Sequence, residues 1–408
     1  MPGAEPSIGG PGGAARKVIV AVALVVGGIV VALLSTEVCR RVARNFVCVG
    51  TADPPLWRVD PRYGWSHVPG AHGWTFGCVG WRYEWRTYVR INALGSRDRE
   101  RTYDGPPNAR RILLLGDSVT EAIQVELEET FGARIEGQMR DRGEPTELLN
   151  TGVAAFGTDN ELQFFESEGV RYGADLVLLV FNVANDLVEN VPELHARMYA
   201  SAPEMMAPKT YFRLDAEGEV SPHEVARPGF VDSRASASWR DRIEDELYFF
   251  RVVHRLIAPP PRPVMSDVDP EIYGMYSPRP GADMTKAWEV TEALLRRLRR
   301  DVDRSGARFA VAVVPSREAV SPEAWKNLLS MTPRLDAASH DPAYPVRRIE
   351  EFLAREGIPH VELLSPLRAA ATQSGSTGYF AWDPHLDASG HAVVATAITP
   401  FVADLLSH

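Results

Sequence analysis

Three side chains in this sequence could act together in nucleophilic catalysis. Ser118 follows Gly116 and Asp117, and near the other end of the chain Asp383 stands two residues before His385. A serine hydroxyl becomes a strong nucleophile when an imidazole takes its proton, and the imidazole needs a third group to fix its tautomer. Because Asp383 and His385 share one short loop, the carboxylate can accept a hydrogen bond from the imidazole locally.

The serine lies at the end of a predicted buried strand. Residues 112–115 form a continuous apolar run, which is typical of a strand buried on both faces. Gly116 permits a tight reversal, so the hydroxyl and the backbone N–H of Ser118 can both face a cleft. Open α/β sheets keep their chemistry at the carboxyl ends of their strands. A Gly-Asp-Ser triplet alone is a weak signal, and its weight depends on the other strands.

A strand, turn and helix pattern repeats from residue 111 onward and predicts a three-layer α/β/α sandwich. The sheet is expected to be mostly parallel, with five strands in flavodoxin-like order. After the first strand, apolar runs place strands at residues 148–149, 175–181, 308–314 and 359–363. Helical periodicity places helices at residues 128–140, 159–170, 284–304, 345–355 and 387–406.

Small and amide-bearing residues follow two of these strands. Gly152 comes after the second strand, and Asn185 and Asp186 come after the third. The carboxyl ends of parallel strands meet at one edge of a sheet, so these residues are expected near Ser118. An isolated Asp-x-His sequence is most often a surface loop, but this one precedes the last helix of an α/β chain, which favours a catalytic interpretation.

The N-terminal part of the chain predicts a membrane anchor. Residues 1–15 are rich in Gly, Pro and Ala and are expected to form a disordered tail. Residues 18–34 are seventeen residues without charge or proline, at the short end of the range for a membrane span. No Ala-x-Ala cleavage site follows, so an uncleaved anchor is favoured over a signal peptide. We expect residues 16–48 to form a transmembrane anchor and juxtamembrane helix.

The orientation of this anchor is less directly encoded. Two basic residues precede the span and three follow it closely, and by the positive-inside rule alone the rest of the chain would stay inside. N-terminal anchors, however, usually translocate the part of the chain on their C-terminal side. We expect a single-pass protein of the cell membrane with its catalytic domain on the outer face.

Residues 51–105 are dense in aromatic side chains and are expected to form a small β-rich appendage. Polar and apolar residues alternate from 81 to 91, as in a half-buried strand or hairpin. Aromatic clusters can bind sugars, and one near a membrane can lie at the headgroup level. We favour packing of the aromatic side chains against the main domain. They are Trp57, Tyr63, Trp65, Trp74, Phe76, Trp81, Tyr83, Trp85 and Tyr88.

The three cysteines, Cys39, Cys48 and Cys78, all lie in this early part of the chain. Their spacing fits no zinc site, because Cys-x2-Cys pairs are absent. If the segment is exported, Cys48 and Cys78 could form a disulfide and leave Cys39 beside the membrane. Three free thiols are the alternative.

Residues 187–283 interrupt the α/β pattern. They are rich in proline, methionine and aromatic residues and contain one amphipathic stretch at 239–257. An insertion placed directly after a strand end is expected to lie over the cleft as a lid or substrate-selecting wall. A passive decoration is the alternative.

Four short sequence blocks occur in a characteristic order: Gly116-Asp117-Ser118, Gly152, Asn185-Asp186 and Asp383-x-His385. Together they resemble the blocks of the SGNH, or GDSL, hydrolase superfamily. The similarity runs from about residue 91 to the end of the sequence, and the domain itself is expected at residues 106–408, interrupted by the insertion. In two places the sequence departs from the family pattern. Val183 stands where the family often has glycine, and one residue rather than two separates Asp383 from His385.

This resemblance implies roles for the site residues. It makes Ser118 the nucleophile and His385 the general base, with Asp383 orienting the imidazole. It also implies an oxyanion hole made by the backbone N–H groups of Ser118 and Gly152 and the side-chain amide of Asn185. A developing oxyanion needs fixed donors, and losing one typically costs about 3 kcal/mol of barrier. Glycine suits position 152 because a side chain would crowd the approach of substrate.

The expected function is a serine esterase that removes acyl groups from a glycan or lipid-like ester through an acyl-enzyme on Ser118. An O-acyltransferase would use the same residues and pass the acyl group to a sugar hydroxyl. A metal-dependent phosphoesterase, with Asp117, Asp186, Asp383 and His385 as ligands, is a third possibility. The sequence has no P-loop to support it. A non-catalytic surface binding module is the fourth.

The composition of the chain limits the classes of partner that it can bind. The formal net charge of −10 argues against nucleic acid, so we expect a small-molecule or glycan ester as substrate and the membrane as the other partner. We expect no cofactor and no metal ion. Asp117 and Asp186 are expected to bond backbone N–H groups in turns, and His391 to pack on a helix face. His254 and His360 have no motif around them.

Overall fold

The computed structural model describes residues 12–43, 48, 56–200, 208–224, 270–332 and 334–407. The chain divides into two compact units. The described residues of the first unit are helix α1 (Gly12–Ala43), Cys48 and Gly80–Arg82, and the second unit contains the rest. The amphipathic stretch predicted at 239–257 lies outside the described residues.

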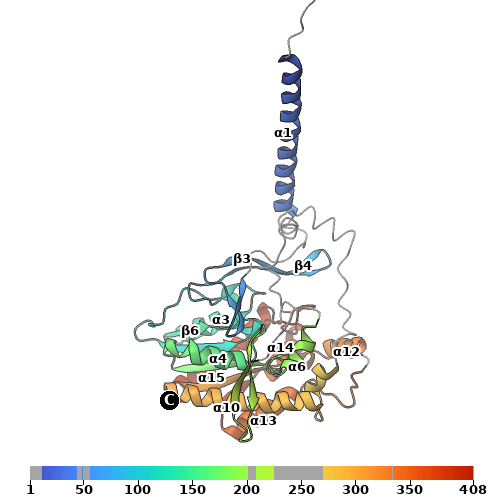
Figure 1. Ribbon diagram of the computed structural model, residues 1–408. Helices are drawn as coiled ribbons and strands as arrows, with labels where there is room; N and C mark the ends of the chain where they lie inside the picture. The colour runs from blue at the N-terminus through green and yellow to red at the C-terminus, as the bar shows by residue number, and fades with distance from the viewer. Residues whose placement is uncertain are drawn as a thin grey trace, which may run out of the picture. The chain divides into compact units, whose positions relative to one another are not determined.

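Five parallel strands form the centre of the second unit (Figure 1). Their order is β11-β10-β7-β5-β6, which numbered along the chain is 5-4-3-1-2 and confirms the predicted flavodoxin-like sheet. The three central strands, β5, β7 and β10, are rich in Leu, Val or Ala and almost wholly buried, as strands covered on both faces must be. The bounds are β5 Arg110–Gly116, β6 Thr146–Asn150, β7 Leu176–Asn182, β10 Arg308–Val314 and β11 His360–Glu362.

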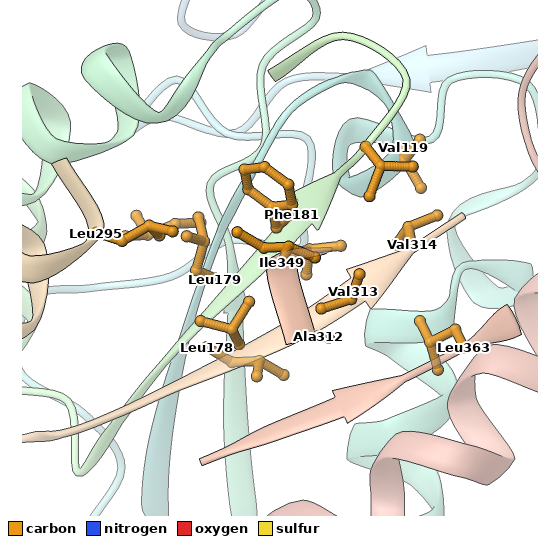
Figure 2. Packing of buried hydrophobic residues seen from close by; sticks show 14 of the residues in the cluster. Val119, Leu178, Leu179, Phe181, Leu295, Ala312, Val313, Val314, Ile349 and Leu363 are labelled. Atoms are coloured by element: carbon orange, nitrogen blue, oxygen red, sulfur yellow. The ribbon is translucent and has the colours of Figure 1, made fainter. Parts of the chain in front are cut away.

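Two groups of helices cover the sheet. In the first group, α3 (Phe131–Asp141) packs on β6, and α15 (Ala388–Ser407) packs on α3. In the second group, α10 (Ala282–Ser305) packs on α4 (Thr158–Ser167), and both α10 and α13 (Tyr344–Glu356) pack on β10. Figure 2 shows the contact of α13 with the sheet, where Ile349 lies among Leu178, Ala312 and Val313.

The shorter elements were mostly missed by the sequence patterns. The helices are α2 Ser118–Glu121, α5 Asp186–Glu189, α6 Pro192–Met198, α11 Arg317–Val320, α12 Pro322–Met331 and α14 Leu364–Ser374, and the 3-10 helices are η1 Leu127–Glu129, η2 Gly169–Tyr172 and η5 Pro270–Tyr276. Inside the predicted insertion, β8 (Thr210–Leu214) and β9 (Val220–Glu224) form an antiparallel hairpin.

The aromatic segment forms two small two-stranded sheets, as its alternating pattern predicted. Strands β1 (Trp57–Asp60) and β2 (Gly64–His67) pair in one, and β3 (His72–Val79) and β4 (Arg82–Arg90) pair in the other. Apart from Gly80–Arg82, these strands belong to the same compact unit as the central sheet. Cys48 and Cys78 are in the disulfide-bonded state, whereas Cys39 is a free, exposed thiol.

Helix α1 is long and apolar enough to cross a membrane. The qualifying segment, Ala15–Thr36, exposes its apolar side chains along its whole length. The helix begins at Gly12, within the range expected to be a disordered tail. In the described part of the chain α15 also passes the length and hydropathy test, but 44% of its apolar window is buried in the protein. It is therefore a core helix, and α1 is the candidate anchor.

Arg97 joins the segment before the sheet to helix α2. Its side chain is buried, and its guanidinium donates to the backbone carbonyls of Glu121, Ala122 and Val125 at 2.7, 2.5 and 2.5 Å. Burial lowers the pKa of Arg97 to about 10, so the group remains charged at neutral pH. One cation thus satisfies three carbonyls that the turn after α2 leaves without helical partners.

Replacing Arg97 with methionine should destabilise the fold by about 3 kcal/mol or more, because three buried carbonyls lose a charged donor. Urea unfolding of the detergent-solubilised protein measures this loss. Arg99→Met is the matched control, since Arg99 is 44% exposed and makes only a surface ion pair with Glu136 at 3.4 Å. Its effect should stay within about 0.5 kcal/mol. Equal effects of the two substitutions would contradict the role given to Arg97.

Candidate active site

Ser118 is the first residue of helix α2, directly after strand β5. Asp117 caps this helix: its Oδ1 accepts from the N–H of Val119 at 2.9 Å, and its Oδ2 accepts from Nδ2 of Asn182 at 2.8 Å. A Cβ on Gly116 would collide with the Thr120 side chain. Asp117 therefore supports the turn, as predicted, and also ties the end of β5 to the end of β7.

The loop before α15 brings the histidine and the second aspartate to the serine. Nε2 of His385 lies 2.7 Å from Oγ of Ser118, and Nδ1 of His385 lies 2.5 Å from Oδ1 of Asp383. Oδ1 also accepts from the backbone N–H of His385 at 3.0 Å. The histidine and aspartate side chains are only 21% and 18% exposed. The sheet thus joins three predicted site residues into one hydrogen-bonded chain.

The aspartate and the histidine shift each other's pKa in the directions expected for an ion pair. Burial alone would raise the pKa of Asp383, but the hydrogen bond and charge of His385 outweigh it and lower the pKa. Burial alone would lower the pKa of His385, but the hydrogen bond and charge of Asp383 outweigh it and raise the pKa above 6.5. The pair therefore favours a charged carboxylate beside an imidazole that holds a proton readily.

The three predicted oxyanion donors differ in their present partners. The backbone N–H of Ser118 has no acceptor among the described residues. The N–H of Gly152 donates to Oδ1 of Asn150 at 3.0 Å. The amide of Asn185 donates to Oε2 of Glu189 at 3.2 Å and also hydrogen-bonds Asp117. Gly152 and Asn185 thus both have internal partners next to the nucleophile turn.

Position 152 requires glycine for a packing reason that the sequence did not indicate. A Cβ there would lie 2.6 Å from the Cβ of Thr120 and 2.6 Å from the backbone nitrogen of Glu121. The residue must be small because it packs against helix α2, before any substrate is considered.

Glu121 is a site residue that the sequence patterns missed. It is fully buried. Its carboxylate accepts from Nε1 of Trp57 at 3.1 Å and the N–H of Ala154 at 2.7 Å, and hydrogen-bonds Nε2 of His67 at 2.7 Å. Its spacing from Ser118 fits a capping box, so the pattern assigns the carboxylate to the helix start. Only the fold shows that it joins α2 to β1 and β2.

One part of the chain matches a known protein family. Residues 279–407 match the family model described as the SGNH hydrolase-like domain of the acetyltransferase AlgX. The match includes Asp383 and His385, and the serine block precedes it in the chain. This part of the chain is similar to an SGNH hydrolase-like domain. No curated protein matches the sequence.

Several solved structures are similar to the chain at low sequence identity. The crystal structure of TesA is 9% identical, with a TM-score of 0.37 over 72% of this chain and 99% of that chain. The acetyl xylan esterase AlAXEase is 11% identical, with a TM-score of 0.38 over 72% and 99% of the two chains. The acetylxylan esterase Axe2 from Geobacillus stearothermophilus is 11% identical, with a TM-score of 0.37 over 73% and 96%.

A group of buried carboxyl groups lies in the second unit, next to the turn that carries Asp117 and Ser118. Asp159, Glu161, Asp186 and Glu189 are all at most 1% exposed. Asp159 accepts from Nζ of Lys209 at 2.8 Å, whereas both oxygens of Glu161 lack a partner in the described part of the chain. Burial raises the pKa of each of these groups, to about 7 for Glu189.

In the residues that the structure describes, no three His, Cys, Asp or Glu side chains are arranged to hold a metal ion. Asp186, a candidate ligand of the phosphoesterase alternative, accepts from the backbone N–H of Asn182 at 2.8 Å. It therefore acts in a turn, as expected.

The other histidines have structural roles or lie outside the described residues. His391 is buried, stacks on Phe131 at 5.5 Å between ring centroids, and accepts from the Phe131 N–H at 3.2 Å. Burial lowers its pKa to about 3, so it packs as a neutral ring. His360 hydrogen-bonds the Ile358 carbonyl. His254 lies outside the described residues.

Glu189 should make the stability of the second unit depend on pH. Its pKa is raised from 4.5 to about 7 on folding, so the stability due to its bound proton is present in full below pH 4.5 and lost as the pH rises through 7. This group alone accounts for a loss of about 3 kcal/mol. In urea unfolding at pH 5 and pH 8, Glu189→Gln should show a smaller loss than the parent protein.

The matched control for this substitution is Glu193→Gln. Glu193 is a half-exposed residue of α6 that pairs with Lys286 at the surface. Its substitution should leave the pH dependence close to that of the parent. An unchanged pH dependence in Glu189→Gln would show that Glu189 does not hold the proton.

Proposed function

We propose that this protein is a membrane-anchored serine enzyme that acts on carboxylic esters through a covalent acyl-enzyme on Ser118. The observation that carries the proposal is the hydrogen-bonded chain Ser118–His385–Asp383, with separations of 2.7 and 2.5 Å. Nucleophile, base and orienting group are within hydrogen-bond reach of one another, as covalent catalysis by serine requires. The SGNH hydrolase-like family match supports the same reaction class.

In the proposed reaction, Oγ of Ser118 attacks the ester carbonyl while Nε2 of His385 takes the hydroxyl proton. Asp383 holds the imidazole by Nδ1 and stabilises the imidazolium that forms. The imidazolium then gives its proton to the leaving alcohol, and the acyl group remains on Ser118. In the second half, His385 activates a water or another hydroxyl, which takes the acyl group and restores the serine.

The oxyanion that forms during attack needs fixed donors. We assign this role to the N–H of Ser118, the N–H of Gly152 and the amide of Asn185. The first of these has no acceptor among the described residues, and the other two exchange Asn150 and Glu189 for the oxyanion. Each donor is expected to lower the barrier by about 3 kcal/mol.

A glycan or lipid-like ester is the substrate class we favour, with acyl transfer to a sugar hydroxyl as the second candidate. The specific observation in favour of transfer is the matching family model, which is described as belonging to an acetyltransferase. The two reactions share the first half and differ only in whether water or a sugar hydroxyl accepts the acyl group. A metal-dependent phosphoesterase and a non-catalytic surface binding module are less well supported, because the geometry leaves Asp383 and His385 engaged with each other and with Ser118.

Ser118→Ala should lower kcat for a short-chain aryl ester by at least about 10³-fold, because the acyl-enzyme can no longer form. In the parent protein, a fluorophosphonate should label Ser118 stoichiometrically, and EDTA should leave the activity intact. The acid limb of kcat/KM should lie above pH 6.5, because the raised pKa of His385 keeps the base protonated to higher pH.

Two results would contradict this proposal directly: full activity in Ser118→Ala, or loss of activity on chelation. No labelling and no turnover in the parent protein would favour the binding module. Faster release of the acyl group when a glycan is added, with acylated glycan as product, would identify a transferase rather than a hydrolase.

We further propose that the catalytic domain lies on the outer face of the cell membrane, anchored by α1. The oxidised state of Cys48 and Cys78 supports this, because disulfides persist in oxidising compartments and are rare in the cytosol. Protease added to intact cells, after permeabilisation of any outer membrane, should digest the domain. A maleimide should modify these two cysteines only after reduction. A protected domain, or two reactive thiols without reductant, would place it inside.

A further inference from the structure

The loop that carries Asp383 and His385 is held by strand β4. The Glu84 carboxylate accepts from the backbone N–H of Trp382 at 2.7 Å and from the backbone N–H of Asp383 at 3.0 Å. The next residue, Trp85, donates its indole N–H to Oδ2 of Asp383 at 2.9 Å. Two adjacent residues of one strand thus make three hydrogen bonds to a loop about 300 residues further along the chain.

The two oxygens of the Asp383 carboxylate have different hydrogen-bond partners. Its Oδ1 accepts from the ring and the backbone of His385, and its Oδ2 accepts from Trp85. The indole bond also contributes to the lowered pKa of Asp383, after the larger contribution of His385. With both oxygens engaged, the carboxylate cannot rotate about its Cβ–Cγ bond without breaking a bond to the imidazole or to the indole.

Strand β3 holds Trp85 in place. A Cβ on Gly77 would lie 2.8 and 2.9 Å from two indole carbons, so only glycine lets the ring lie against this part of the strand. The same hairpin also reaches the nucleophile side, because Thr75 and Thr87 donate to the carbonyls of Ile123 and Gln124 just after α2, at 3.3 and 3.0 Å. The hairpin therefore contacts both the segment after Ser118 and the loop before α15.

We propose that Glu84 and Trp85 are positioning residues for Asp383, and that hairpin β3–β4 is a working part of the active site rather than a separate appendage. This inference rests on the proposed serine mechanism. Glu84 sets the path of the loop backbone, and Trp85 sets the rotation of the carboxylate. The imidazole then meets Ser118 Oγ in the geometry that proton transfer requires.

Trp85→Phe tests the role of the indole donor, because phenylalanine keeps an aromatic ring and removes the N–H. Hydrogen bonds to charged groups correspond to roughly a tenfold to hundredfold effect, so kcat/KM for a short-chain aryl ester should fall at least tenfold. The rate of fluorophosphonate labelling should fall in parallel. The freed oxygen makes Asp383 a stronger partner for the imidazolium, so the acid limb of the pH profile should move to higher pH.

The matched control is Tyr88→Phe on the same strand. Its hydroxyl makes a hydrogen bond of 2.7 Å to Nδ1 of His72, and this substitution also removes one donor from the hairpin. It should leave kcat/KM and the acid limb unchanged. Both variants should have the thermal midpoint of the parent chain, so that a change in rate reflects position rather than folding.

Glu84→Gln tests the backbone contact independently of the indole. The two N–H groups are bonded to different oxygens of Glu84, and glutamine replaces one of these oxygens with an NH2 donor, so the loop loses one restraint. We expect kcat to fall about tenfold with KM for the small ester nearly unchanged, because the substrate does not touch this side chain. If Trp85→Phe lowers the thermal midpoint, the rates of Glu84→Gln decide whether the hairpin positions Asp383.

The outcomes separate the inference from the function on which it rests. A parent protein without labelling and without esterase activity would overturn the proposed function and the inference together. An active parent whose Trp85→Phe and Glu84→Gln variants keep its rates and pH profile would overturn the inference alone. A lowered rate and a shifted acid limb in Trp85→Phe, absent from Tyr88→Phe, supports it.

Discussion

The short contact between Ser118 Oγ and His385 Nε2 joins residues 267 positions apart in the chain. Neither residue can move far toward the other, because each is held by its own element. Ser118 begins a helix whose cap, Asp117, is bonded to the end of a neighbouring strand, and His385 is bonded to Asp383 within one turn. The contact therefore exists only if the parallel sheet places the end of β5 and the loop before α15 at the same edge. A register slip of β5 by one residue would turn its side chains to the opposite face and remove the contact.

Three buried or half-buried carboxylates surround the imidazole of His385. Asp117 and Glu121 both contribute to the raised pKa of His385, after the larger contribution of Asp383. Each of these carboxylates accepts hydrogen bonds from its surroundings. Glu161 has no donor in the described part of the chain, and burial raises its pKa well above the ordinary value. Several carboxyl groups can therefore be buried together, because burial raises their pKa values and favours their neutral forms.

The central fold and the serine, histidine and aspartate were predictable because their signals are local. A run such as residues 112–115 has one interpretation in an α/β pattern, and Asp383 and His385 are two residues apart. Glu121 was missed because its three partners come from distant segments, and its local spacing indicates a helix cap instead. The packing of Gly152 against α2 was not predicted, because it is visible only in three dimensions. Helices α12 and α14 were missed because they bury few side chains, Leu328 in α12 and Leu364 and Leu367 in α14, and so carry little apolar periodicity.

The 267-residue separation also has a consequence for biosynthesis. At roughly 5–20 residues per second, the ribosome adds His385 about 15 to 50 seconds after Ser118. Throughout that time Ser118 lacks its hydrogen bond to His385. Strand β4 likewise lacks the loop that Glu84 and Trp85 contact. Under the proposed mechanism, the nascent chain therefore cannot acylate Ser118 on esters that it meets during translation. The contact between Ser118 and His385 forms only when the last strand and the loop before α15 join the sheet.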